Sequence, residues 1–316
     1  MTSSDPALDR VPFQQIDRTL SGDGFVARDI VDYIQHLQTA LAVTLPLSLH
    51  IAQTLRLFKG STVSLFTGFV TPGLYPRGEN DGPLGTLALA RSLARCGLIP
   101  TIEVDPQILD TVRWLAAELG FEARIDEIDL DVLAATPPAV AIAIEKPGQN
   151  AAGIMHTFDG IAIEDGSIAM DSLFRQWLAA GTVTIGIGDR GNEIGFGHLQ
   201  DVVTEQLPAS ATCRCGCGHG VVCSTATELF LPAAVSNWGA YGIAAALAIL
   251  ENDETLVHLP TEEQRLLQVA AVRGCVDGVR RRSGFGVDGH SGETSIAIVR
   301  RLHEIVQTAL QGSRTP

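Results

Sequence analysis

Two acids and an amide lie in a glycine-dense turn between residues 183 and 197, which reads VTIGIGDRGNEIGFG. A short apolar, β-prone run leads into this turn, which carries Asp189, Asn192 and Glu193 between four glycines. Glycine has no Cβ, so it lets the backbone adopt positive φ or approach a ligand closely. Polar side chains presented in this way at the end of a strand predict a binding or catalytic site.

A further carboxylate, Glu145, ends the apolar run AVAIAIE. The oxygens of Glu145, Asp189 and Glu193, together with Asn192, suit a hard cation such as Mg²⁺ or Mn²⁺. Two of these acids could instead serve as a general base and a general acid. Each could also cap a turn or pair with a neighbouring basic residue. The residue types therefore predict a polar site and leave its chemistry open between these alternatives.

The same turn matches the dinucleotide-binding fingerprint through Gly186, Gly188 and Gly191. That fingerprint belongs in a first βαβ unit, where it opens a long helix. Here it lies past the middle of the chain, and further glycines follow it. The sequence also lacks the GxxxxGK[ST], GxSxG and HExxH signatures. We therefore expect no nucleotide cofactor.

Four of the six cysteines lie in the segment CRCGCGHGVVC, between Cys213 and Cys223. Zinc sites usually use CxxC pairs, and this C-x-C-x-C spacing differs from that pattern. We expect a tight glycine-rich loop with reduced thiols. The alternative is a structural zinc or iron site that uses these thiols and His219.

Short apolar runs alternate with helical patterns from residue 62 to residue 187. Runs at 62–69, 100–104, 139–145 and 183–187 read as buried strands, and such alternation indicates a mainly parallel sheet with helices on both faces. The expected fold is α/β, with a Rossmann-like three-layer core and a smaller C-terminal α/β part. Residues 1–55 are expected to be a helical lead-in whose first 25 residues are irregular, and residues 56–316 the α/β domain.

Polar residues follow several of the expected strands, where ligands bind in open α/β sheets. They are Thr67 and Gly68, Glu103 and Asp105, Glu145 and Lys146, and the segment from Asp189 to Glu193. Two predicted helix starts, at Gly82-Pro83 and at Ser236-Asn237, could hold an anionic group through free N–H groups and the helix dipole.

The formal net charge of −14 over 316 residues argues against nucleic acid or an anionic membrane as a partner. No uninterrupted apolar run reaches the roughly 18 residues of a membrane span. The polar N-terminus differs from a secretory or transit peptide. These features are typical of a cytoplasmic enzyme that handles small molecules. The small-residue-rich helix expected at 233–249 could also pack between subunits of a homo-oligomer.

Five segments in order resemble the D-glutamate cyclase family. They are ENDGPLGTLALARSL, IEKPG, MDSLF, TIGIGDRGNEIGFG and VSNWGAYGIAAALA. The resemblance covers most of residues 55–310, and its GIGDRGNEIG and SNWGAY blocks are specific. Longer family members carry an additional N-terminal domain.

The resemblance implies a lyase that converts D-glutamate, an acidic amino acid, into 5-oxo-D-proline and water. In this reading a divalent cation, Mg²⁺ or Mn²⁺, sits on Glu145, Asp189 and Glu193 and polarises the γ-carboxylate. The substrate-binding residues and the catalytic acids follow from the same reading. We expect substrate contacts from Thr67, Gly68, Gly82, Lys146, Asn192, Ser236 and Asn237, and catalysis by Glu193 with either Asp81 or Asp171 as the base.

Two other functions remain open from the sequence. One is a protein that binds a metal or an acidic amino acid without cyclase activity. The other is a metal-dependent hydrolase such as a phosphatase.

Overall fold

A six-stranded sheet in the order β3-β2-β1-β4-β5-β6 forms the centre of the molecule. All of its strand pairs are parallel. The computed structural model describes residues 8–312, so the first seven residues of the expected lead-in lie outside the described part. The strands are β1 (Thr62–Thr67), β2 (Ile99–Val104), β3 (Arg124–Glu127), β4 (Val140–Ile144), β5 (Val183–Gly188) and β6 (Leu229–Pro232). The α/β fold expected from the alternating pattern is confirmed.

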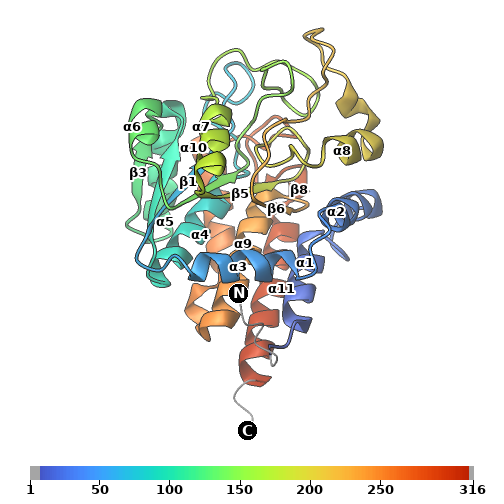
Figure 1. Cartoon of the computed structure of the whole chain (residues 1–316). Coiled ribbons are helices and arrows are strands. Elements are labelled where there is room, and N and C mark those ends of the chain that lie inside the picture. Colours follow the sequence, from blue (N-terminus) through green and yellow to red (C-terminus); the bar gives the residue numbers. More distant parts are fainter. Residues whose placement is uncertain (1–7, 313–316) are drawn as a thin grey trace.

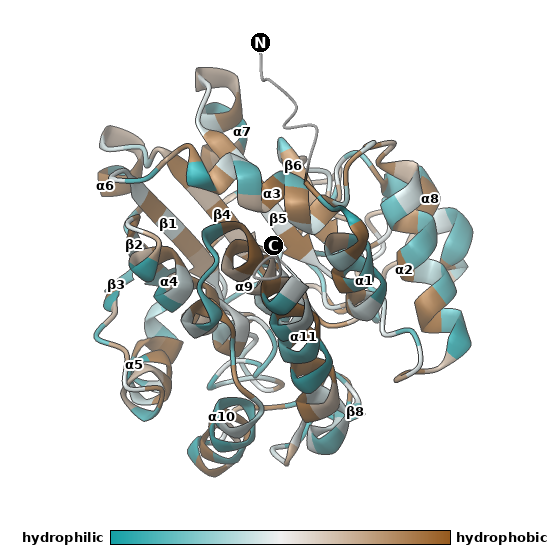
Figure 2. Ribbon diagram, turned by 90° about the horizontal axis from the view of Figure 1, so that it is seen from below, coloured by the Kyte–Doolittle hydropathy of each residue, from teal (hydrophilic) through white to brown (hydrophobic). Residues whose placement is uncertain are grey.

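The central strands are apolar because both of their faces are covered. All five residues of β4 are buried, as are five of the six in β1. Figure 2 shows these strands and helix α9 (Ser236–Glu251) in hydrophobic colours. Continuous apolar runs of this kind are typical of parallel sheets that are buried on both sides.

The strand register places two helical layers on opposite faces of the sheet. Phe66 and Gly186 lie on one face, because β1, β4 and β5 pair in register. On that face the Phe66 ring packs against Phe174 and Trp177 of α7 (Asp171–Ala180). Ile187 points to the other face, where it lies beside Gly239 of α9. This second layer also contains α4 (Pro83–Arg95), which packs closely along α9.

The N-terminal segment is more regular than expected. Its first helix, α1 (Val11–Leu20), falls where an irregular chain is predicted, so that prediction was wrong. The helix buries Phe13, Ile16 and Leu20 in the common core. Two further helices follow, α2 (Arg28–Ala40) and α3 (Leu47–Arg56), with Pro46 directly before α3. The position of a domain boundary near residue 55 stays a prediction.

The remaining helices surround this core. They are α5 (Leu109–Glu118), α6 (Leu130–Ala135), α8 (Gln200–Gln206), α10 (Pro260–Arg273) and α11 (Gly292–Gly312), and a small hairpin of β7 (Gly286–Val287) and β8 (His290–Ser291) precedes α11. Within residues 8–312, no helix combines the length and apolar character that crossing a membrane requires.

The loops that follow the strands gather at one edge of the sheet, at the top of Figure 1. The strand order reverses between β1 and β4, because β2 and β3 lie on one side of β1 whereas β5 and β6 lie beyond β4. In open α/β sheets such a switch point opens a crevice outside the carboxyl ends of the strands. The fold therefore directs attention to the residues that follow β1, β4 and β5.

Candidate active site

Three carboxylates meet at this switch point. Asp81 precedes α4, Glu145 directly follows β4, and Asp189 directly follows β5. One oxygen from each lies within 4.8 Å of the others, and all three side chains are buried. Three residues from distant parts of the sequence thus form one acidic cluster.

The N-terminus of α9 fixes the position of Asp81. Its carboxylate accepts hydrogen bonds from Ser236 N (3.0 Å), Asn237 N (2.8 Å) and Gly82 N (3.0 Å). Free N–H groups at a helix start favour an anion. Here a side chain of the protein occupies that position.

Gly82 allows the chain to turn into α4 beside the cluster. Its φ is 91°, and an added Cβ would lie 2.6 Å from Thr67 Oγ1 and 2.8 Å from Glu145 Cβ. A larger residue would therefore collide with the site itself. This contact explains why glycine follows Asp81.

Glu145 adopts a strained backbone conformation. Its φ is +49°, a region that non-glycine residues rarely enter. Ser236 Oγ donates a hydrogen bond of 2.5 Å to its carboxylate, and its backbone N–H bonds to Ile187 O. Such strain occurs often at functional sites, where the surrounding structure enforces it.

Glu193 lies next to the cluster but is held by its own loop. Its two oxygens accept hydrogen bonds from Arg190 N (3.2 Å) and Gly191 N (2.9 Å). In contrast, Asp189 Oδ1 is buried and has no hydrogen-bond partner. The arrangement brings Asp81, rather than Glu193, together with Glu145 and Asp189.

Further charged groups surround the three carboxylates. Glu79 and Asp288 are also buried, and Arg190 forms an ion pair of 2.8 Å with Asp288. The Arg190 guanidinium also lies over the Phe158 ring, 4.8 Å from its centre. Asp288 itself has a positive φ of 44°.

Burial is the main cause of unusual protonation in this cluster. It raises the pKa of Asp81 to about 8, and the nearby Asp288 carboxylate adds to the effect. Burial likewise raises the pKa values of Glu79, Glu145 and Asp189 well above their ordinary range, again with help from neighbouring acids. So many buried acids require protons or a cation to balance their charge.

A small cavity adjoins the cluster. It is lined by Phe69, Tyr75, Glu79, Glu145, Thr157, Phe158, Arg190, Asn192 and Asp288. Asn192 donates its Nδ2 hydrogen to His156 O, whereas its Oδ1 is buried without a partner. The cavity therefore combines aromatic walls, a guanidinium group, three carboxyl groups and one unused acceptor.

The donor set fits a hard divalent cation. Asp81, Glu145 and Asp189 provide converging carboxylate oxygens, the ligand type that Mg²⁺ and Mn²⁺ prefer. The unpartnered Asp189 Oδ1 is a free ligand atom in this group.

Other residues singled out from the sequence lie in supporting positions. Lys146 is fully buried, and its Nζ lies 2.5 Å from Asp105 Oδ2. Asp171 Oδ1 accepts hydrogen bonds from Gln149 N (2.9 Å) and Thr225 Oγ1 (2.5 Å), which joins two loops. Neither Lys146 nor Asp171 lines the cavity, and their roles toward a substrate stay predictions.

The remaining residues expected to contact a substrate do not line the cavity. Ser236 and Asn237 donate to Glu145 and Asp81, as described above, and Asn237 Oδ1 accepts from Gly85 N at 2.6 Å. Thr67 lies beside Gly82, and its hydroxyl is buried without a partner. The next residue, Gly68, has a φ of 105° and lies beside Asp105 and Ile108. Ser236 and Asn237 thus position the acids, and direct substrate contacts from all four residues stay predictions.

Sequence reasoning gave no site role to Glu79 or Arg190. Asp288 lies in one of two Val-Asp-Gly repeats, at 276–278 and 287–289, for which the sequence leaves tight turns and a binding role equally open. Asp277 of the first repeat does hold a turn, accepting from Val279 N and Arg280 N. Only its counterpart Asp288 reaches the cavity, and the repeat alone does not distinguish the two.

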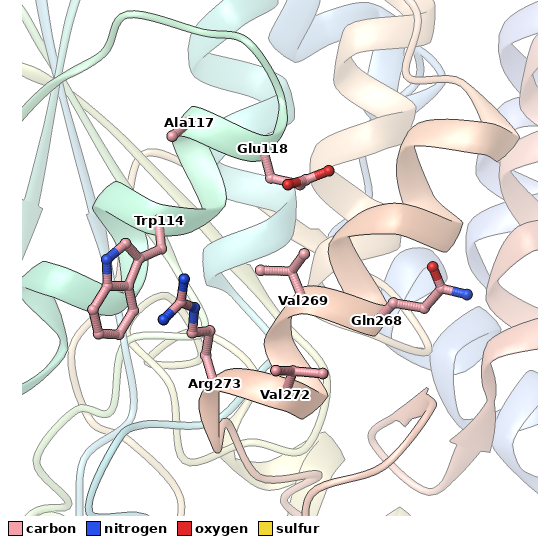
Figure 3. A pocket seen from close by; sticks show the side chains of 7 residues that line it. All are labelled: Trp114, Ala117, Glu118, Gln268, Val269, Val272 and Arg273. Atoms are coloured by element: carbon pink, nitrogen blue, oxygen red, sulfur yellow. The ribbon is translucent and has the colours of Figure 1, made fainter.

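A second surface pocket lies between α5 and α10, away from these acids. Figure 3 shows its lining side chains, among them Trp114 and Arg273, whose guanidinium lies 4.2 Å from the centre of the Trp114 rings. The carboxylate in this lining, Glu118, pairs with Arg265. This pocket has no cluster of titratable groups comparable to the switch-point site.

Comparison with known proteins places the chain in a family. Residues 29–303 match the family model described as D-glutamate cyclase-like, C-terminal. Mitochondrial D-glutamate cyclase from Homo sapiens is 27% identical over 222 residues, which cover 62% of this chain and 34% of that protein. The chain thus matches about a third of the length of this curated relative.

Among solved structures, RecJ from Thermus thermophilus in complex with Mn²⁺ aligns with 85% of this chain and 37% of that chain, with a TM-score of 0.36 and 11% sequence identity. A likeness this weak bears on neither mechanism nor metal. The family model, which spans most of the chain, shows that this protein belongs to the D-glutamate cyclase-like family.

Proposed function

We propose that this protein cyclises D-glutamate to 5-oxo-D-proline with release of water. The observation that carries the proposal is the buried cluster of Asp81, Glu145 and Asp189, which adjoins a small cavity at the switch point of the sheet. The family relationship supports D-glutamate as the substrate, because the curated relative is named as a D-glutamate cyclase.

A divalent cation, Mg²⁺ or Mn²⁺, would be held by these three carboxylates. When bound, such an ion neutralises and polarises a carboxylate oxygen, which makes the carboxyl carbon a better electrophile. This assignment exchanges Glu193 of the sequence-based hypothesis for Asp81, because it is an oxygen of Asp81 that lies within 4.8 Å of oxygens of Glu145 and Asp189.

The cavity residues can orient a folded substrate. Arg190 brings positive charge to a site rich in acids, and this charge can hold a substrate carboxylate. Asn192 Oδ1 is a free acceptor for the substrate amine. Phe69, Tyr75 and Phe158 form apolar walls that limit access of water.

Glu79 is the best-placed general base of the cavity. No hydrogen bond from the described residues restrains its carboxyl group, whereas Asp81 is fixed by three N–H donors. Burial raises the Glu79 pKa well above its ordinary range, which makes the ionised carboxylate a stronger base. In this role Glu79 replaces the Asp81 and Asp171 of the sequence-based hypothesis.

The reaction then proceeds within one substrate molecule. The amine loses a proton to Glu79 and attacks the γ-carboxyl carbon, so that a C–N bond forms. The nitrogen passes its second surplus proton to a γ-carboxyl oxygen, the protonated Glu79 returns its proton to the same oxygen, and the C–O bond breaks so that this oxygen leaves as water. Because both reacting groups belong to one chain, holding it folded supplies a large part of the catalysis.

An assay of 5-oxoproline formation tests the proposal. Purified protein is incubated with D-glutamate, with EDTA or with added Mn²⁺, and the product is followed by chromatography. We expect turnover that chelation abolishes, and a loss of at least about 100-fold in Asp189→Asn and Glu79→Gln. The exposed Asp201→Asn serves as the matched control. Tight Mn²⁺ binding without turnover would support a binding protein instead, and full activity of Asp189→Asn would overturn the proposed site.

A further inference from the structure

Three thiols and one imidazole converge outside the carboxylate cluster. Cys213 Sγ lies 3.3 Å from Cys215 Sγ and 3.4 Å from Cys217 Sγ. His156 Nε2 lies 3.1 Å from Cys215 Sγ. All four atoms lie within 4.8 Å of one another. The loop of C-x-C-x-C spacing thus turns its three sulfurs toward one point, and the histidine comes from a different segment.

This geometry is close to that of a tetrahedral metal site. Zinc–sulfur bonds of about 2.3 Å separate two sulfurs of a tetrahedron by about 3.8 Å. The observed sulfur separations of 3.3 and 3.4 Å need only a small expansion to admit an ion. Three thiolates and one imidazole form a Cys₃His set, one of the usual sets of structural zinc.

The neighbouring contacts support a role for the sulfurs as ligands. Asn150 Nδ2 lies 3.3 Å from Cys217 Sγ and donates toward it, an interaction of the kind that stabilises a metal-bound thiolate. A disulfide would use only two of the three thiols and would leave the imidazole without a function. His219, the histidine within the loop, is exposed and does not belong to the group.

The cluster also borders the candidate active site. His156 O accepts the hydrogen bond from Asn192 Nδ2, and the next two residues, Thr157 and Phe158, line the cavity. Arg214 N bonds to Gly160 O, which joins the cysteine loop to the same segment. An ion bound by His156 would therefore fix one wall of the cavity.

We propose that Cys213, Cys215, Cys217 and His156 Nε2 bind one structural zinc ion. The ion fastens the cysteine loop to the segment 156–160. This site differs from the carboxylate cluster in the metal that it prefers. Soft thiolates select zinc, whereas the carboxylates select hard cations.

Metal analysis of the full-length protein tests the proposal. The protein is purified without chelator, and zinc is measured by elemental analysis in the unaltered chain, Cys215→Ser, His156→Gln and His219→Gln. We expect one zinc per chain in the unaltered protein and in His219→Gln. We expect at least a tenfold lower content in Cys215→Ser and in His156→Gln. The Asp189→Asn variant should keep its zinc, which separates this site from the proposed function.

Cobalt substitution gives a second readout that does not depend on any variant folding. Co²⁺ added to the zinc-depleted protein should produce thiolate-to-metal charge-transfer bands and the intense visible bands of a tetrahedral ion. Absence of these bands, a disulfide between two of the three cysteines in the zinc-free isolated protein, or zinc lost only in His219→Gln would each overturn the proposal.

Discussion

At the scale of single residues, the buried ion pair of Lys146 and Asp105 stabilises the fold. Lys146 and Asp105 have no exposed side-chain surface, and they form a direct ion pair. Asp105 Oδ1 also accepts a hydrogen bond from Ile168 N. A buried pair of this kind costs desolvation energy but becomes essential once formed, because either partner alone would be an unpaired buried charge.

Replacing Lys146 by Met should therefore reduce stability more than it affects ligand binding. Asp105 would lose its counter-ion, and we expect the free energy of unfolding to fall by about 3–5 kcal/mol. Denaturant titration measures this change. In the double variant Lys146→Met/Asp105→Leu part of the loss should be recovered, because no unpaired charge remains but Ile168 N loses its acceptor. If Lys146→Met keeps its stability but no longer binds D-glutamate, the lysine instead contacts the substrate.

Glu103 provides a residue-scale prediction for pH dependence. Burial, helped by repulsion from Asp126 on the neighbouring strand, raises the pKa of Glu103 to about 7. A carboxyl group whose pKa is higher in the folded than in the unfolded chain contributes its full stabilisation at pH values below its pKa in the unfolded chain. That stabilisation is lost as the pH rises from about 4.5 to about 7.

The Glu103→Gln variant removes this loss. After allowance for solvent screening, we expect it to be more stable than the unaltered protein by about 1 kcal/mol at about pH 8, and nearly equal at about pH 5. Thermal unfolding at both pH values measures the difference. An equal change at the two pH values would show that the effect does not arise from ionisation.

At the scale of elements, the close contact between α4 and α9 holds the acidic cluster in place. An added Cβ at Gly85 would lie 2.7 Å from Asn237 Cα and 3.0 Å from Asn237 O, both backbone atoms. Gly85 N also donates to Asn237 Oδ1. The start of α9, which binds Asp81, thus depends on a glycine in another helix.

The Gly85→Ala variant should separate the two helices. Alanine favours an isolated helix by about 1 kcal/mol, but here overpacking should lower the stability by about 1–3 kcal/mol. Because the donors to Asp81 shift with α9, we expect Mn²⁺ affinity to fall at least about tenfold. Calorimetric titration and denaturant unfolding measure the affinity and the stability, respectively.

The control for this prediction is Gly284→Ala, where an added Cβ meets no atom within 4 Å. Unchanged Mn²⁺ affinity in Gly85→Ala would contradict this link.

At the scale of elements, the sequence could predict part of the site. Alternation and strand-end positions predicted the parallel sheet and brought Glu145 and Asp189 to one edge, because β4 and β5 are neighbours. Asp81 was named, but its place beside them depends on how tightly α4 packs on α9. Asp288 reaches the cavity from a distant turn, and His156 reaches the cysteines from another loop. Such long-range contacts leave no periodic signal in the sequence.

At the scale of the whole molecule, the acidic cluster is destabilising until its charge is balanced. The chain carries a formal net charge of −14, and the carboxylates of the cluster are buried together at the switch point. A ligand that binds only the folded state stabilises it by mass action. A cation held by Asp81, Glu145 and Asp189 should therefore raise the stability of the entire fold.

Adding Mn²⁺ to chelator-treated protein should raise its unfolding temperature. At a free concentration about 100 times the dissociation constant, the gain is about 2.7 kcal/mol, or about 4 °C for a chain of this size. Differential scanning calorimetry measures the shift. It should persist in Asp201→Asn and in Cys215→Ser, because neither residue belongs to the carboxylate cluster. It should disappear in Asp189→Asn. An equal shift in Asp189→Asn would mean that Mn²⁺ acts by screening the negative surface, and not by binding between the three carboxylates.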